Sequence, residues 1–173
     1  APQLVNVING TGIVLHTGVG RAPCRGKQLK DLADRLDGYV NLEFDLESGN
    51  RGDRQTLIHE QLSSMCGAEA GMVVNNNAAA VFLALNEMAD GGEVICSRGQ
   101  MVEIGGSFRI PDIIEKSGAI LKEVGTTNRT HLKDYEKAIS KKTKLILWVH
   151  TSNYVVKGFT KEVSLSDLVM LGK

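Results

Sequence analysis

Several features that would point to particular protein classes are missing from this sequence of 173 residues. The three cysteines, Cys24, Cys66 and Cys96, form no C-x-x-C pair and are odd in number. This pattern argues against a disulfide framework and against a thiolate zinc site, so we expect reduced, mostly buried thiols. The four histidines show no H-E-x-x-H spacing, and a metal site therefore has no support in the sequence.

Net charge and long apolar runs are also absent. Twenty Lys and Arg balance twenty Asp and Glu, so charge gives no reason to propose nucleic acid or an anionic membrane as a partner of this segment. No apolar run approaches the roughly 20 residues of a membrane span, and the first residues, APQLVNVING, lack the charged and apolar regions of a secretion signal. We therefore expect a cytoplasmic protein with no membrane partner.

What is present is an alternation of short apolar runs with helical segments. Helices are predicted near Gly26 to Leu36 and from Gln55 to Met65, where apolar side chains fall on one helical face. Further along, apolar runs typical of strands alternate with helical patterns, and this alternation predicts an α/β fold with a mostly parallel sheet and helices on both faces. The strands are expected at residues 71–74, 93–97, 119–125 and 144–150, and the helices at residues 78–89, 110–118, 132–140 and 164–172.

The composition divides the chain into two regions. Residues 1–52 are rich in glycine and irregular, and we interpret them as an N-terminal arm with a short helix; residues 53–173 form an incomplete α/β domain. Ser164 and Asp167 form an S-x-x-D capping pattern that opens a last helix shortly before Lys173. A crossover helix normally delivers the next strand, so we expect these residues to belong to a longer protein. The alternative is a terminal helix that caps the sheet.

Three consecutive asparagines, Asn75, Asn76 and Asn77, stand between an apolar run and an apolar helix. One asparagine suffices as a helix cap. The first N–H groups of a helix lack intrahelical partners and carry the positive end of its dipole, so they can hold a phosphate, and Ala78 is small enough for close approach. A phosphate-bearing ligand is typical of this place at the carboxyl edge of a parallel sheet. An asparagine-rich turn without a ligand is the alternative.

Other motifs narrow the choice of ligand. The P-loop pattern G-x-x-x-x-G-K-[ST] is absent, and Pro23 replaces the third glycine of a dinucleotide fingerprint in GVGRAP. Three arginines, Arg21, Arg51 and Arg54, lie in glycine-rich loops where a guanidinium can bind anionic oxygens, although for any one of them a solvated surface arginine is the more common case.

Two loops after predicted strands are typical of ligand sites. Residues 97–113, SRGQMVEIGGSFRIPDI, are expected to bury little and to place Arg98, Glu103 and Arg109 around Gly105-Gly106. Residues 148–154, WVHTSNY, end an apolar strand with His150, Thr151, Ser152 and Asn153. A histidine in this setting is more often a satisfied core residue than a ligand-binding one.

Long motifs resemble a known family. INGTGIVLHTGVGRAP, NLEFDLESGNRGDR, GAEAGMVVNNNAAAVFLALN and VGTTNRTHLKDYEKAI are similar to bacterial selenocysteine synthases, the L-seryl-tRNA(Sec) selenium transferases. The resemblance covers almost the whole chain. It implies the large domain of a fold type I pyridoxal phosphate enzyme and a ring-shaped homo-oligomer built from dimers. The implied reaction converts seryl-tRNA(Sec) to selenocysteinyl-tRNA(Sec) by β-replacement with selenophosphate.

The same resemblance implies roles for individual residues. The lysine that forms the Schiff base is expected beyond Lys173, so this chain holds no catalytic residue and is expected to be inactive alone. TGVGRAP departs from the family's TNLGRAP but keeps Arg21, which is expected to bind selenophosphate, while Arg51 and Arg54 are expected to serve a neighbouring subunit. The residues expected to bind the cofactor are Asn75, Asn76, Asn77 and Ala78 for its phosphate, Arg98 or a neighbour for its ring face, Ser152 and Asn153 for its phenolic oxygen, and Glu103.

Two alternatives to this function are kept. A pyridoxal phosphate-dependent ammonia lyase would act on a small amino acid or an amino sugar phosphate with the same fold. A non-catalytic phosphate-binding or assembly module would keep the packing of the fold and no enzyme activity. Binding of pyridoxal phosphate by the full-length protein would separate the two enzymes from the module.

Overall fold

The computed structural model describes residues 3–105 and 107–173, so Gly106 of the predicted Gly105-Gly106 turn lies outside the described residues. The chain forms two compact units, Ala1–Ala70 and Gly71–Lys173, which are described separately. The division predicted after residue 52 follows sequence composition, whereas this one follows spatial contacts, and the predicted domain boundary stays a prediction.

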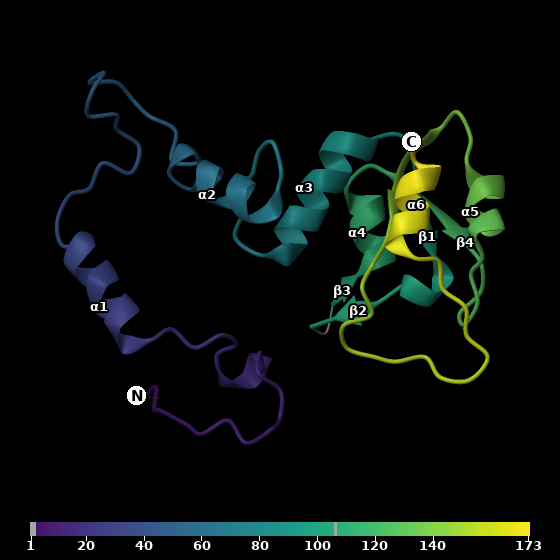
Figure 1. Ribbon diagram of the computed structural model, residues 1–173, viewed down its shortest axis with the longest axis horizontal. Coiled ribbons are helices and arrows are strands. Elements are labelled where there is room, and N and C mark those ends of the chain that lie inside the picture. Colours follow the sequence, from purple (N-terminus) through teal and green to yellow (C-terminus); the bar gives the residue numbers. More distant parts are fainter. Residues whose placement is uncertain (1–2, 106) are drawn as a thin grey trace. The chain divides into compact units, whose positions relative to one another are not determined.

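The first unit contains two α-helices joined by irregular chain (Figure 1). Helix α1 spans Gly26–Arg35 and is exposed along its whole length, and helix α2 spans Thr56–Cys66 and is at most partly buried. Helix α2 ends at Gly67, whose φ of 63° lies in the left-handed region that glycine adopts without steric cost. Both helices confirm the sequence prediction to within one residue at each end. A short 3-10 turn, Thr17–Val19, precedes them.

The second unit is built on a parallel sheet. Its strands β1 (Glu93–Ser97), β4 (Ile120–Val124) and β5 (Thr143–Leu147) lie in the order β4-β1-β5, and β1 pairs in parallel with both neighbours. A small antiparallel hairpin, β2 (Glu103–Ile104) and β3 (Phe108–Arg109), follows β1. The predicted α/β class with a mostly parallel sheet is confirmed.

Helices cover both faces of this sheet, as the sequence predicted. Helices α3 (Asn77–Ala89) and α4 (Ile110–Lys116) pack on one face, and α5 (Leu132–Ala138) and α6 (Leu165–Leu171) on the other (Figure 1). Successive side chains of a strand point to opposite faces. Val94 and Cys96 therefore join Leu85 and Ile114 in the first core, whereas Ile95 packs with Tyr135 and Leu168 in the second.

Two sequence expectations about local structure are wrong. Gly71–Val74 does not form a strand, because an apolar sequence cannot supply the neighbouring strand that a hydrogen-bonded ladder requires, and the three-stranded sheet does not include this segment. The thiols are not mostly buried either. Cys96 is buried inside β1, but Cys24 and Cys66 are exposed because they belong to the first unit, where few side chains are covered.

The last helix has the cap that the sequence predicted. The Ser164 hydroxyl accepts the Asp167 N–H at 3.1 Å, and this bond opens α6. Within residues 3–105 and 107–173, no helix has the length and apolar character needed to cross a membrane. The same residues contain no group of three or more His, Cys, Asp or Glu side chains that could hold a metal ion.

Candidate functional site

A cavity of about 390 Å³ lies at the carboxyl end of β5, inside the second unit. Cavities that hold small ligands and cofactors measure roughly 300–1,000 Å³ and combine an apolar lining with a few polar groups. Three segments form its walls: the start of α3, the β2–β3 hairpin with its flanks, and the end of β5 with the loop that follows. The lining residues are Asn77, Val81, Val102, Ile104, Phe108, Ile110, Leu147, Trp148, Val149, His150 and Ser152.

The N-terminus of α3 forms the polar end of this cavity. The Asn76 side chain caps the helix by accepting the Ala79 N–H at 2.9 Å. Asn77, the first helical residue, lines the cavity, and the first turn of α3 carries no acidic residue. The N–H groups of Asn77 and Ala78 have no intrahelical acceptor by the geometry of a helix, and they carry the positive end of its dipole. This end of the cavity can therefore hold an anionic oxygen.

The loop after β5 supplies further polar groups. Ser152 lines the cavity, and its backbone N–H donates to the His150 carbonyl at 2.9 Å. His150 is exposed and stacks on Trp148, with ring centroids 6.0 Å apart and planes inclined by 24°. Of the residues predicted to bind the cofactor, Asn77 and Ser152 thus lie on the same cavity. Their position at a helix start and at a strand's carboxyl end agrees with the sequence argument.

The remaining predicted cofactor residues on these loops make other contacts. The Arg98 guanidinium donates to Glu123 at 2.8 Å and to the Gly125 carbonyl at 3.4 Å. Glu103 accepts from Arg109 at 2.6 Å across the β2–β3 hairpin, which raises the pKa of the Arg109 guanidinium. The Asn153 amide donates to the Glu103 backbone carbonyl at 3.2 Å. Arg98, Glu103 and Asn153 do not line the cavity, and their cofactor contacts stay predictions.

The three candidate anion-binding arginines lie in the first unit. Arg51 and Arg54 both pair with the Glu43 carboxylate, Arg54 at 3.3 Å, so an internal anion already faces them. Arg21 is exposed and has a φ of 60°. A non-glycine residue seldom adopts this left-handed conformation, which is enriched at ligand sites. Geometry therefore singles out Arg21 among the three.

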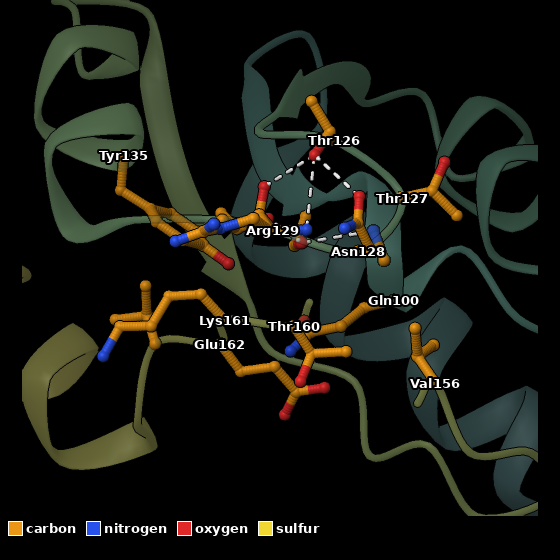
Figure 2. A pocket seen from close by; sticks show the side chains of 14 residues that line it. Gln100, Thr126, Thr127, Asn128, Arg129, Tyr135, Val156, Thr160, Lys161 and Glu162 are labelled. Carbon is orange, nitrogen blue, oxygen red and sulfur yellow. Dashed lines mark hydrogen bonds between the residues drawn. The ribbon is translucent and has the colours of Figure 1, made fainter. Parts of the chain in front are cut away.

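A second, much smaller pocket lies beyond β1 and β4 (Figure 2). Its volume of about 10 Å³ is close to the space that one water molecule needs. Figure 2 shows the Thr126 hydroxyl bonded to both backbone groups of Arg129, at 3.0 and 3.2 Å, which folds the loop tightly. The buried hydroxyls of Ser97 and Thr130, which also line this pocket, lie 2.7 Å apart. This pocket is too small for a cofactor.

Buried ionisable groups near β1 are held in their neutral forms. Burial raises the pKa of the Cys96 thiol to about 12, and burial also raises the pKa of the Tyr135 hydroxyl to about 12. A thiol must lose its proton to act as a nucleophile. Cys96 is consequently a core residue and not a candidate nucleophile at neutral pH.

Sequence reasoning missed much of the cavity wall. It expected residues 97–113 to bury little, but Gln100, Val102 and Ile110 are 5%, 4% and 3% exposed. The expectation is wrong because it gave weight to the glycines and charged residues of this segment, whereas apolar side chains such as Val102 and Ile110 pack in the core with α3 and β5. The spacing of Val102, Phe108 and Ile110 across two glycines was the signal that could have revealed a hairpin with one buried face.

Residues 7–173 match the family described as L-seryl-tRNA selenium transferase. The chain belongs to this family. It is 58% identical to the L-seryl-tRNA(Sec) selenium transferase of Geobacter metallireducens over 99% of its own length and 37% of that protein. It is 59% identical to the enzyme of the same name from Nitratidesulfovibrio vulgaris, over 96% of the chain and 36% of the relative. It is 55% identical to the L-seryl-tRNA(Sec) selenium transferase of Aquifex aeolicus, over 99% of the chain and 38% of the relative.

A solved structure shares the fold of this selenium transferase family member. The structural match to D-glucosaminate-6-phosphate ammonia-lyase covers 90% of this chain and 43% of the lyase chain, with a TM-score of 0.69 and 22% sequence identity. This likeness shows the fold alone. The chain spans between 36% and 38% of the three curated relatives described above, so the activity of a selenium transferase is a property of a longer protein.

Proposed function

We propose that this chain is the N-proximal half of the catalytic core of an enzyme that converts seryl-tRNA(Sec) to selenocysteinyl-tRNA(Sec). The observation that carries the proposal is the family match over residues 7–173 together with the cavity at the start of α3. Pyridoxal phosphate is the proposed cofactor, selenophosphate the selenium donor, and a homo-oligomer built from dimers the working form. Because the proposed substrate is a tRNA, the proposed location of the enzyme is the cytoplasm.

The cavity fits a group with one phosphate and one aromatic ring. Its volume of about 390 Å³ lies within the range for cofactor sites, and its lining combines apolar side chains with polar groups from the start of α3 and from the loop after β5. The start of α3, with Asn77 and Ala78, would hold the phosphate. Val81, Val102 and Ile110 would exclude water from the ring, and Ser152 would offer a hydroxyl to its polar edge. When bound, pyridoxal phosphate supplies an electron sink for a carbanion at the substrate's Cα.

The residues of this chain then have binding and orienting roles. Low polarity along the cavity wall strengthens every hydrogen bond made inside it. Arg21 is proposed to bind the selenophosphate anion, since an arginine fork matches the oxygens of a phosphate. Arg51 and Arg54 would join a neighbouring subunit's site after exchanging Glu43 for a substrate anion. The group that bonds covalently to the cofactor, and the acid that faces its ring nitrogen, would come from residues outside this chain.

The test is binding of pyridoxal phosphate by the full-length protein. We expect a visible absorption band of the protein-bound cofactor that is absent from a protein with its cofactor removed. A correctly folded protein that shows no such band would overturn the proposal and favour the non-catalytic module. Selenium transfer from selenophosphate to seryl-tRNA(Sec), compared with ammonia release from serine or amino sugar phosphates, separates the transferase from a lyase.

A further inference from the structure

The turn that follows β1 contains a buried amide side chain. Gln100, the last residue of the short 3-10 helix Arg98–Gln100, is 5% exposed. Its Oε1 accepts the backbone N–H of Val149 at 3.1 Å, although the two residues are 49 positions apart in the chain. Strand β5 ends at Leu147, so the Val149 N–H lies beyond the sheet ladder. Gln100 replaces the acceptor that a neighbouring strand would offer.

Two more hydrogen bonds join the loop after β5 to the segment that follows β1. The Tyr154 hydroxyl donates to the Gly99 carbonyl, and the Asn153 amide donates to the Glu103 carbonyl at 3.2 Å. Tyr154 is only partly exposed, and burial raises the pKa of its hydroxyl, so this group keeps the proton it donates. The loop of residues 148–154 is thereby held at its beginning and at its end.

The fastened loop is the part of the structure that carries polar groups into the cavity. Val149, His150 and Ser152 all line it. The Gln100 bond is the first of the three along the loop, and it acts on the residue immediately before His150. Gln100 is buried and Val149 is partly buried. Removing one partner of such a bond is costly, because the other is left unsatisfied in a place with little access to water.

We propose that Gln100 is a positioning residue for the ligand cavity: through the Val149 N–H it fixes the loop that presents His150 and Ser152. The proposal rests on the proposed function in that pyridoxal phosphate is taken as the ligand. Gln100 touches neither ligand nor cavity itself. It acts through the loop, and the carboxamide supplies an acceptor without placing a charge in the buried turn.

The first test measures backbone amide exchange in the full-length protein. Gln100→Met keeps the length of the side chain and removes the acceptor, and we expect exchange across residues 149–154 to become about tenfold faster. Gln100→Glu keeps an oxygen acceptor at the same place but adds a charge to the buried turn, so it should restore part of the protection. The matched control is Asn86→Leu, which removes a side-chain amide bond to the Ser117 carbonyl, 2.9 Å long, on the helix α3 side of the core. This control should leave exchange in the loop unchanged.

The second test measures the affinity for pyridoxal phosphate. Gln100→Met should weaken binding about tenfold, Gln100→Glu should bind with an affinity between those of Gln100→Met and the wild type, and Asn86→Leu should bind as the wild type does. Unchanged loop exchange in Gln100→Met overturns the positioning role. Faster exchange with unchanged affinity overturns its link to the cavity. If Gln100→Met does not fold, Tyr154→Phe removes the Gly99 bond and is judged by the same two measurements.

The outcomes distinguish this inference from the proposed function. A wild-type protein that binds no pyridoxal phosphate refutes the proposed function. In that case the exchange measurement alone decides whether Gln100 holds the loop. A wild-type protein that binds the cofactor, with Gln100→Met equal to Asn86→Leu in both measurements, refutes the inference and leaves the proposed function in place.

Discussion

At the scale of single residues, backbone strain marks one arginine. Arg21 has a φ of 60° and follows Gly20, whose φ is 91°, and its N–H donates to the His16 carbonyl at 3.0 Å. A left-handed conformation costs a non-glycine residue roughly 1–2 kcal/mol. The hydrogen bond to His16 maintains this conformation within the turn. The sequence pointed to Arg21 from its loop, and its binding of selenophosphate stays a prediction.

Replacing Arg21 should affect the anionic substrate and not the cofactor. We expect Arg21→Ala in the full-length enzyme to lower the efficiency with selenophosphate by about 10- to 100-fold, the loss expected for hydrogen bonds to a charged group. Steady-state kinetics at varied selenophosphate and a pyridoxal phosphate titration would measure the two effects. Arg35→Ala, at the exposed end of α1, serves as the control. Undiminished selenium transfer by Arg21→Ala would refute the role.

A second residue-scale effect concerns acid stability. Lys122, at 3.0 Å, and the Ser140 hydroxyl, at 2.8 Å, hold the pKa of the Glu93 carboxyl below its ordinary value of 4.5. The folded state therefore binds this proton less tightly than the unfolded state. The contribution of Glu93 to the free energy of unfolding is therefore fully present above about pH 4.5. It is lost as the pH falls through the lower pKa that Glu93 has in the folded state.

Glu93→Gln should remove this pH dependence. We expect the variant to be less stable than the wild type at about pH 7 and the difference to shrink below about pH 4.5. Urea unfolding at both pH values measures it, with Glu87→Gln on the exposed surface of α3 as the control. A difference that stays constant with pH would show that Glu93 contributes through packing instead of charge.

At the scale of elements, the three asparagines do not share one task. Asn76 caps α3 by accepting the Ala79 N–H, and Asn77 is the first helical residue and lines the cavity. Asn75 is exposed before the cap. The sequence argument that one asparagine suffices for capping is confirmed, because the structure assigns the cap to Asn76. Whether the others face a phosphate stays a prediction.

Two substitutions of Asn76 separate capping from phosphate binding. Asn76→Ala should lower the free energy of unfolding by about 1 kcal/mol through loss of the cap. Asn76→Asp keeps the cap and suits the helix dipole, so stability should hold, but its negative charge should repel a phosphate and weaken pyridoxal phosphate binding about tenfold. Chemical denaturation and a cofactor titration give the two values. Full cofactor affinity in Asn76→Asp would contradict a phosphate at this helix start.

Elements with local signals were predictable, and those that depend on distant partners were not. The cap at Ser164, the cap at Asn76 and the apolar pattern of β1 each depend on residues that are near neighbours in sequence. The irregular path of Gly71–Val74 depends on which other segments lie beside it. Local hydrogen bonds can be inferred from nearby residues, but strand pairing requires knowledge of the partner.

At the scale of the whole second unit, the crossover connections indicate at which edge of the sheet a further strand would lie. The chain passes from β1 by α4 to β4 on one side, and returns by α5 on the opposite face to β5 on the other side. Parallel crossovers are right-handed in about 98% of cases. Since α6 covers the same face as α5, a further right-handed crossover leads to the outer edge of β5. A groove of about 550 Å³, lined mainly by apolar side chains of β5, α6 and their flanks, lies there.

In the longer proteins of this family, we therefore expect the next strand to pair in parallel with β5 and to leave β4 at the sheet edge. Hydrogen exchange of the full-length protein measures this order. Amides along the whole of β5 should exchange as slowly as those of β1, whereas β4 should keep fast-exchanging amides on its outer side. Slow hydrogen exchange on the outer side of β4, together with fast exchange in β5, would contradict this strand order.

The sequence by itself determined the α/β class, the helix caps, the buried character of β1 and the asparagines at a helix start. These follow from side-chain periodicity and from hydrogen bonds between near neighbours. Only the tertiary structure decided that Asn77 and Ser152 line one cavity, that Glu43 pairs with Arg51 and Arg54, and that Gln100 accepts a hydrogen bond from Val149. Those contacts join segments far apart in the chain, and their formation depends on the packing of helices and strands between them.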